Sequence, residues 1–135
     1  MEVYDLNTSV DSILANISTR GLVQGGDNVL IAGTIVVGQA AQKVIIRALG
    51  PSVNVPGRLG DPTLELYDGN GTLLEANDNW KASPNKQAII DSTVPPTNDL
   101  ESVIVRTLTP AAYTAIVRGV GGTPGVGVVE MYVLN

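Results

Sequence analysis

Thr63–Ala76 reads TLELYDGNGTLLEA, two apolar runs on either side of a turn rich in Gly and Asn. In the first run apolar and polar side chains alternate, which is typical of a strand with one buried face. Glycine and asparagine tolerate the positive φ angles that tight turns between antiparallel strands require. This stretch therefore predicts a β-hairpin, and similar apolar runs recur along the rest of the chain.

The length of the turn sets the register of this hairpin. A two-residue loop of Gly69 and Asn70 would place Leu64 opposite Glu75 and so bring charge into the buried face. A three-residue loop that ends in a left-handed Gly71 gives one consistent apolar face. We expect the three-residue loop, which pairs Leu66 with Leu74 and Leu64 with Ala76 on the buried face, and Glu65 with Glu75 on the outer face.

Short runs of this kind, separated by Gly, Pro, Asn and Asp, indicate an all-β protein. About eight or nine strands at this spacing indicate a two-layer antiparallel sandwich or a barrel. The expected strands are Glu2–Leu6, Ile13–Ser18, Asn28–Val37, Lys43–Leu49, Thr63–Tyr67, Thr72–Ala76, Ser102–Leu108, Tyr113–Arg118 and Val126–Leu134, and the one expected helix is Lys86–Ser92.

The segment Asn28–Val37 is apolar on both of its faces. A strand of this kind is usually covered on both sides. In a two-layer sandwich the second cover would be a loop, a neighbouring domain or another chain. The alternative is an ordinary central strand that lies under a long loop.

Composition restricts the possible functions. The 135 residues suit one domain, and 44% of them are hydrophobic although there is no Phe. The chain has no Cys and no His, which excludes thiol nucleophiles, Ser-His-Asp triads and His-bearing zinc sites. The net charge is −5 with scattered basic residues, so nucleic-acid binding is not expected. No apolar run reaches the roughly 18 residues of a transmembrane helix, so membrane insertion is not expected either.

The two ends of the sequence match each other. EVYDLN at Glu2–Asn7 and EMYVLN at Glu130–Asn135 share four of six residues, at an offset of 128 positions. An offset of one domain length predicts a tandem array in which each unit ends with this strand. Residues 1–12 are then an N-terminal strand and linker, from a preceding repeat, and residues 13–135 are the sandwich unit. A chance match between two ordinary strands is the alternative.

Two equivalent strands could compete for one position in a sheet, and an unpaired copy can pair with another chain. Donation of Glu2–Asn7 to a neighbouring copy would propagate head to tail. The residues expected in these assembly strands are Glu2, Val3, Tyr4 and Leu6 and their counterparts Glu130, Met131, Tyr132 and Leu134.

Three further stretches carry a family resemblance. Asp61–Leu74 followed by Asn77–Trp80 resembles the central hairpin of bacterial pre-peptidase C-terminal (PPC-like) domains, and Leu108–Gly119 looks like their following strand pair. Leu14–Gly21 looks like the opening of a repeat of very large secreted bacterial proteins. The resemblance implies a jelly-roll-like sandwich that serves as an accessory module of a secreted protein. Some relatives bind calcium or matrix polymers such as collagen.

Asp61, Asp78 and Asn79 are the candidate metal ligands. The expected register places Asp61 opposite Asn79 and beside Asp78, and such oxygen ligands suit Ca²⁺. The alternative is that these side chains only cap turns. Apart from calcium, no cofactor is predicted. Trp80 is a possible ligand contact through ring stacking, although a lone Trp more often covers the end of a core.

These observations favour a non-catalytic structural or adhesive repeat module, located outside the cell or on its surface, whose export signal is not in this sequence. Its expected partners are neighbouring copies or repeats of itself. The alternative is an accessory module that binds calcium, a polysaccharide or a matrix protein. A third hypothesis, a hydrolase with paired carboxylates, would use Asp61, Asp78 and Glu75.

Overall fold

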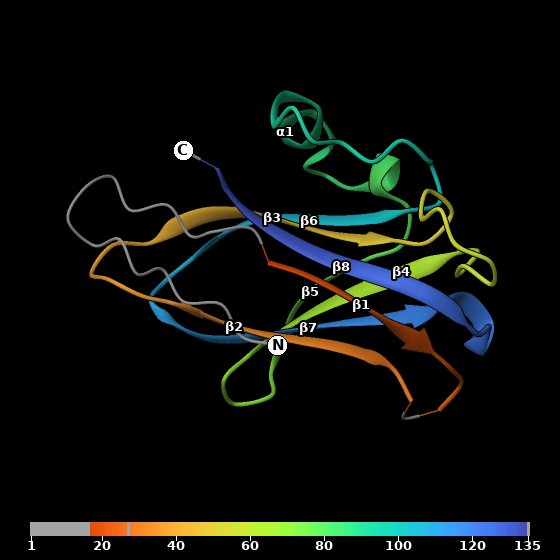
Figure 1. Ribbon diagram of the computed structural model, residues 1–135. Coiled ribbons are helices and arrows are strands. Elements are labelled where there is room, and N and C mark those ends of the chain that lie inside the picture. Colours follow the sequence, from red (N-terminus) through yellow and green to blue (C-terminus); the bar gives the residue numbers. More distant parts are fainter. Residues whose placement is uncertain (1–16, 27, 135) are drawn as a thin grey trace.

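A computed structural model of the chain describes residues 17–26 and 28–134. They form two four-stranded antiparallel sheets packed face to face (Figure 1). In spatial order, sheet A contains β1 (Ile17–Val23), β8 (Gly125–Leu134), β3 (Gln42–Leu49) and β6 (Ser102–Leu108). Sheet B contains β2 (Leu30–Val36), β7 (Ala111–Gly119), β4 (Pro62–Asp68) and β5 (Leu73–Asn77). The predicted all-β sandwich is confirmed; the predicted strand Glu2–Leu6 lies outside the described residues.

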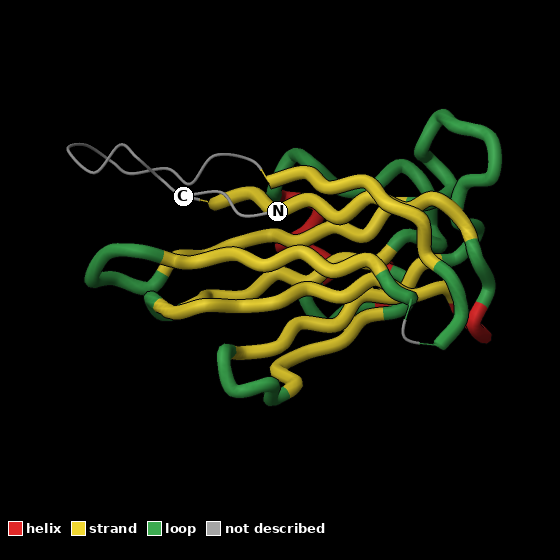
Figure 2. The backbone as a smooth tube through the Cα atoms, turned by 60° about the horizontal axis from the view of Figure 1, so that its bottom comes forward, coloured by secondary structure: helices red, strands yellow, loops and turns green. Residues whose placement is uncertain are grey.

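The strands run along the length of the sandwich and most loops gather at its two ends (Figure 2). Ile17, the first residue of β1, pairs with Met131 near the end of β8. The first described residue and the last therefore lie at the same end of the molecule, which we call the connector end. The loop before β4 and the short helix η2 (Val120–Gly122) lie at the opposite end, which we call the far end.

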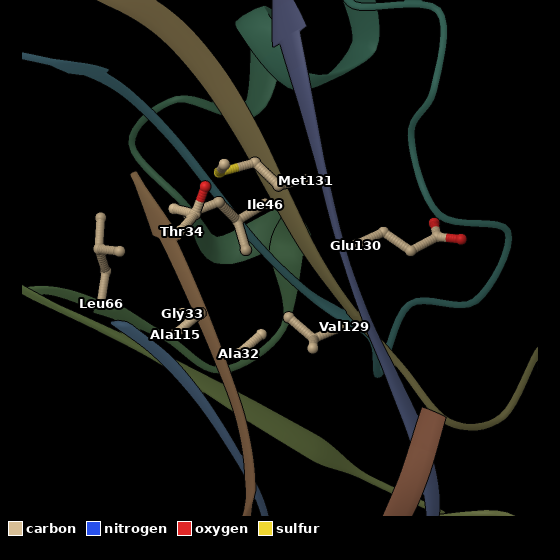
Figure 3. Close-up of a pocket in the computed structure, with 9 residues that line it drawn as sticks. All are labelled: Ala32, Gly33, Thr34, Ile46, Leu66, Ala115, Val129, Glu130 and Met131. Atoms are coloured by element: carbon tan, nitrogen blue, oxygen red, sulfur yellow. The ribbon is translucent and has the colours of Figure 1, made fainter. Parts of the chain in front are cut away.

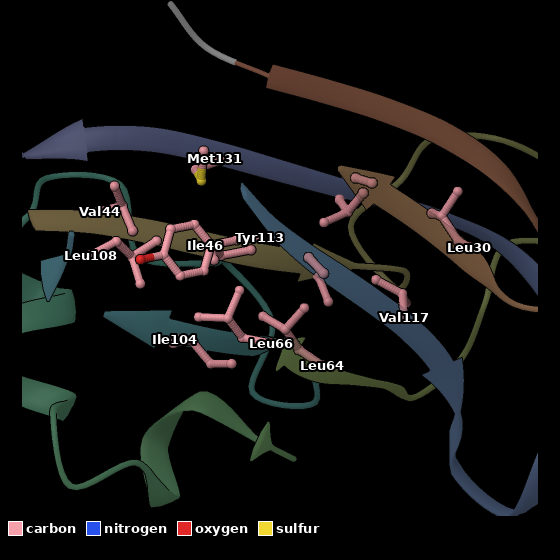
Figure 4. Close-up of a cluster of buried hydrophobic side chains, with 14 of the residues drawn as sticks. Leu30, Val44, Ile46, Leu64, Leu66, Ile104, Leu108, Tyr113, Val117 and Met131 are labelled. Atoms are coloured by element: carbon pink, nitrogen blue, oxygen red, sulfur yellow. The ribbon is translucent and has the colours of Figure 1, made fainter. Parts of the chain in front are cut away.

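The space between the sheets is filled by aliphatic side chains that alternate along the strands (Figure 4). This packing explains why a chain without Phe can still form a core. At the connector end Tyr113 is almost completely buried, and its hydroxyl donates a hydrogen bond of 2.6 Å to the carbonyl oxygen of Thr109. The bond ties the start of β7 to the preceding turn.

A second apolar cluster covers the outer face of sheet A. The segment with η1 (Trp80–Ala82) and α1 (Lys86–Asp91) packs Trp80 and Ile89 against Ile45. The predicted helix is thus confirmed to within one residue. No helix among the described residues is both long and apolar enough to cross a membrane.

The first described strand differs from its prediction. The expected strand was Ile13–Ser18, whereas β1 continues to Val23. Gly21 lies within this longer strand. A Cβ atom at this position would lie 2.8 Å from Cδ1 of Leu30 on β2, so a larger residue would displace the end of that side chain.

The apolar segment Asn28–Val37 forms an edge strand and not a central one. In β2 the side chains of Leu30, Ala32, Thr34 and Val36 face the core and are buried. The opposite face is not covered, since Ile31 is 52% exposed. The alternative of a central strand under a long loop is therefore wrong for the described part of the chain, whereas cover by a neighbouring domain or another chain stays a prediction.

The predicted hairpin turn is present, but its register shifts within the strands. Gly71 has a positive φ of 80° and Tyr67 pairs with Leu73, as a three-residue loop requires. A β-bulge then moves the partner strand by one residue. The predicted pairs of Leu66 with Leu74, Leu64 with Ala76 and Glu65 with Glu75 are wrong; the observed pairs are Leu66 with Glu75, Glu65 with Ala76 and Leu64 with Asn77.

The bulge has an electrostatic advantage. The predicted register set two glutamates opposite each other, which is unfavourable. In the shifted register, Glu65 accepts a hydrogen bond of 2.9 Å from Nε of Arg118, and Glu75 lies 3.2 Å from Nη1 of Arg106. The like-charge pair is thus replaced by two ion pairs with neighbouring strands.

Candidate functional site

The predicted calcium ligands gather at the far end of the sandwich. The carbonyl oxygen of Asp61 accepts a hydrogen bond of 2.9 Å from the backbone N–H of Val120. The hydroxyl of Ser102 donates to the carbonyl oxygen of Pro62 at 2.8 Å and accepts from the N–H of Asn79 at 3.3 Å. Ser102 thereby joins the segment that carries Asp61 to the segment that carries Asn79.

The pairing that the sequence predicted within this group is absent from the described ladder. The ladder between β4 and β5 ends at Leu64 and Asn77, so Asp61 and Asn79 are not cross-strand partners. Asp61 and Asp78 nevertheless interact through their charges. Loop contacts thus bring these residues to one end of the sandwich, and the sequence pattern does not predict such contacts.

Two oxygen atoms of this group lack hydrogen-bond donors. Oδ1 of Asp61 and Oδ1 of Asn79 are both enclosed, and neither has a partner among the described residues. Burial, and secondly the charge of Asp78, raise the pKa of the Asp61 carboxyl above its usual value of 3.8. A positive charge beside Asp61 would reduce the penalty on its ionised carboxyl.

The donor set is small for a metal centre. The described residues contain no group of three or more His, Cys, Asp or Glu side chains that could hold a metal ion. Ca²⁺ needs about six to eight oxygen ligands. Two carboxylates and one amide would therefore have to be completed by backbone carbonyl oxygens and water.

Trp80 is a structural residue. Its ring is only 6% exposed, and its Nε1–H donates a hydrogen bond of 3.2 Å to the carbonyl oxygen of Asn98. The ring packs in the layer that covers sheet A. The burial of Trp80 fits the alternative, in which the lone tryptophan covers a core.

The assembly residues predicted in the C-terminal strand also serve the fold. Glu130 and Tyr132 lie in β8, which has partners on both sides, β1 and β3. Arg47 forms an ion pair with Glu130 through Nη2 and also donates from Nε to Glu130 Oε1 at 3.0 Å. The hydroxyl of Tyr132 donates to the same oxygen at 3.0 Å. Burial, followed by the charge of Glu130, raises the pKa of Tyr132.

Glu101 is a buried carboxylate that sequence analysis missed. It is completely buried at the start of β6, and its Oε2 accepts hydrogen bonds from Gly50 N at 3.0 Å, Ser52 N at 3.1 Å and Ser52 Oγ at 2.6 Å. Its position after a polar loop reads as an exposed turn, so no local signal could have identified it. Glu101 fastens the loop that follows β3.

The enclosed cavity between the two sheets of the described residues is too small for a substrate. A cavity of about 10 Å³ lies between the sheets beside Thr34, Ile46 and Met131 (Figure 3). A volume of this size holds at most one water molecule. Its polar group is the hydroxyl of Thr34, which is buried and has no hydrogen-bond partner among the described residues.

Comparison with known proteins gives a likeness of fold. No family model matches the sequence, and no curated protein matches it. Among solved structures, the pre-peptidase C-terminal domain of a collagenase from Bacillus anthracis is similar over 86% of this chain and 88% of that domain, with a TM-score of 0.54 and 13% identity. The chain therefore has the fold of a PPC β-sandwich domain, as the sequence resemblance implied.

Proposed function

We propose that the chain is a non-catalytic structural repeat module of a secreted or surface protein. The observation that carries this proposal is the match between Glu2–Asn7 and Glu130–Asn135. Residues Glu130–Leu134 of the second copy form the second half of the last strand, β8, which lies inside sheet A. A sequence that completes one sandwich is the sequence expected at the end of a preceding sandwich in an array.

The likeness of fold supports a role as an accessory module. The solved structure with this fold is a domain of a collagenase, that is, one part of a larger protein. The absence of Cys and His removes the residue types on which most nucleophilic and general-base catalysis depends. Glu75, which a hydrolase with paired carboxylates would use, is held in an ion pair by Arg106.

The finer part of the proposal is that copies assemble by strand donation. Of the four edge strands, β5 and β6 are bridged to each other by side chains. Asn77 Oδ1 accepts from Val103 N at 2.9 Å, and Arg106 Nη1 donates to the carbonyl oxygen of Leu74 at 3.1 Å. The edges of β1 and β2 are therefore the candidate acceptors for a donated Glu2–Asn7 strand.

The test compares the full chain with a chain that lacks Met1–Asn7, by size-exclusion chromatography with light scattering and by negative-stain microscopy. We expect the full chain to form larger, head-to-tail species and the shortened chain to be monomeric. A full-length control with Tyr4→Ser and Leu6→Ser separates the effect of pairing from that of length. Equal sizes of the full and shortened chains would contradict strand donation.

Calcium binding is the second candidate function, favoured by the two enclosed oxygens of Asp61 and Asn79. Calorimetric titration with CaCl₂ should give heat, and the melting temperature should rise by several degrees between EDTA and millimolar calcium. Asp61→Asn should abolish both effects, whereas the matched control Asp91→Asn on α1 should retain them. A flat titration with an unchanged melting temperature excludes calcium.

Binding of polysaccharide or a matrix protein has less support. The one tryptophan that could stack on a sugar is buried. The fold likeness to a collagenase domain is the remaining argument for a matrix partner. A glycan and collagen array probed with the labelled chain tests this alternative, and the absence of binding would leave the structural role.

A further inference from the structure

The outer face of sheet B exposes apolar side chains from four strands. Ile31 on β2 is 52% exposed and Leu73 on β5 is 50% exposed. Ile35, Tyr67 and Ile116 are half-buried on the same side of the sheet, where Ile31 pairs with Ile116 and Tyr67 pairs with Leu73. We call these five residues the sheet B face.

The sheet B face differs from the outer face of sheet A. On sheet A the segment with Trp80 and Ile89 packs over the strands and buries their outward side chains. Over sheet B the described residues provide no such layer. The main charges on this side, Glu65 and Arg118, neutralise each other at 2.9 Å. The surface is thus apolar and close to neutral, which suits contact with another protein surface.

The chain segments that lead into β1 and out of β8 are called the connectors. If the chain repeats as proposed above, their positions indicate which partner can contact the sheet B face. Ile17 pairs with Met131, and β8 continues only three residues further, to Leu134. At a rise of about 3.3 Å per residue and a strand spacing of about 4.8 Å, the two connectors leave the sandwich roughly 11 Å apart. Both emerge at the connector end.

A period of 128 residues leaves ten residues between Leu134 and the next Ile17. Ten residues span at most about 35 Å when fully extended. The ten residues of β8 alone span about 33 Å, so a neighbour at the far end would need a completely stretched connector. A neighbour beside the sandwich is within easy reach.

A hollow on the sheet B face lies at the connector end of the sandwich. It has a volume of about 530 Å³ and is lined by Tyr67, Ala112, Thr114, Ile116 and the turn with Asp68, Gly69 and Gly71. This turn is at the connector end, where the neighbour would be tethered. A tether of this length holds the neighbouring copy at an effective concentration in the millimolar range, so even a weak contact between the two copies would form.

We propose that the sheet B face is the lateral contact surface between neighbouring copies of this unit. The contact uses side chains of β2, β4, β5 and β7 and does not require Glu2–Asn7. It rests on the proposed repeat role, but it is distinct from strand donation. The occupant of the hollow is then the surface of a second copy of the chain.

The test uses the full chain at 20 µM to 1 mM, with sedimentation velocity and ¹⁵N-HSQC spectra. We expect concentration-dependent shifts at the backbone amides of β2, β4 and β7. Ile31→Lys should reduce self-association at least tenfold. Ile90→Lys is the matched control, because Ile90 is 43% exposed on α1, away from sheet B and from the edges of β1 and β2. The dispersion of each spectrum shows whether the variant is folded.

A chain that stays monomeric at 1 mM without shifts would overturn the proposal, as would self-association that Ile31→Lys leaves unchanged. Association that is lost on removal of Met1–Asn7 but kept in Ile31→Lys would support strand donation and overturn the lateral contact. Association that survives that removal but is lost in Ile31→Lys would support the lateral contact and contradict strand donation.

Discussion

Replacement of Glu101 by alanine tests the role of the buried carboxylate. In Glu101→Ala the buried N–H of Gly50 loses its acceptor, which costs about 1–3 kcal/mol. The two donors of Ser52 lose the same oxygen but lie at the surface, where water can replace it. The removed methylene and carboxyl groups leave a void worth about 1 kcal/mol more. We expect a loss of about 3 kcal/mol in the free energy of unfolding.

The conservative variant Glu101→Gln separates the hydrogen bonds from the packing. It retains the volume and one acceptor oxygen but loses the charge that strengthens the bonds to Gly50 and Ser52, at a cost of about 1 kcal/mol. Urea denaturation at pH 7 measures both changes, and for a chain of this length a loss of 3 kcal/mol should lower the melting temperature by roughly 10 °C. A loss below about 1 kcal/mol in Glu101→Ala, or a larger loss in Glu101→Gln, would refute the role as acceptor.

Three further changes have defined outcomes. Thr34→Val should raise the free energy of unfolding by about 1 kcal/mol, because it removes a buried hydroxyl without a partner at constant shape; a loss in urea denaturation would show that the hydroxyl is satisfied. Tyr113→Phe should lower it by about 1–2 kcal/mol, since the carbonyl oxygen of Thr109 loses its donor; an unchanged urea midpoint would contradict this. Asp61→Asn should raise the melting temperature in EDTA at pH 7 but not at pH 3. Folding raises the Asp61 pKa and so favours the neutral carboxyl. The stability that the neutral carboxyl adds to the wild-type protein is lost as pH rises through that pKa. A lower melting temperature of Asp61→Asn at pH 7 would contradict the assignment.

The hairpin shows how far the sequence could predict the fold. The turn follows from local chemistry, because Gly71 is the residue that tolerates the positive φ, and the pairing of Tyr67 with Leu73 follows from the turn. The bulge beyond it does not follow from local chemistry. In the shifted register Glu75 lies 3.2 Å from Arg106 of the other sheet, a contact that the local sequence does not predict.

Other differences also arise from contacts between distant segments. The close approach of Gly21 to Leu30 follows from the packing of two strands and not from the local sequence. Asn28–Val37 reads as a covered strand, because an apolar outer face gives the same pattern whether it is buried in this chain or by another one. Glu101 reads as a surface residue, and only the folded loop shows the donors around it. Hydrophobic periodicity predicts which strands exist, but it does not predict their partners.

The far end of the sandwich is packed more tightly than its glycine content predicts. The glycines of residues 119–127 read as a flexible loop, but a Cβ atom at Gly125 would lie 2.5 Å from Cα of Leu59. Leu59 is completely buried, and its N–H donates to the carbonyl oxygen of Val126 at 2.8 Å. Asp61 follows two residues later and is held by Val120. The backbone around Asp61 is thus held from both sides, by the contact of Leu59 with Gly125 and by the hydrogen bond from Val120.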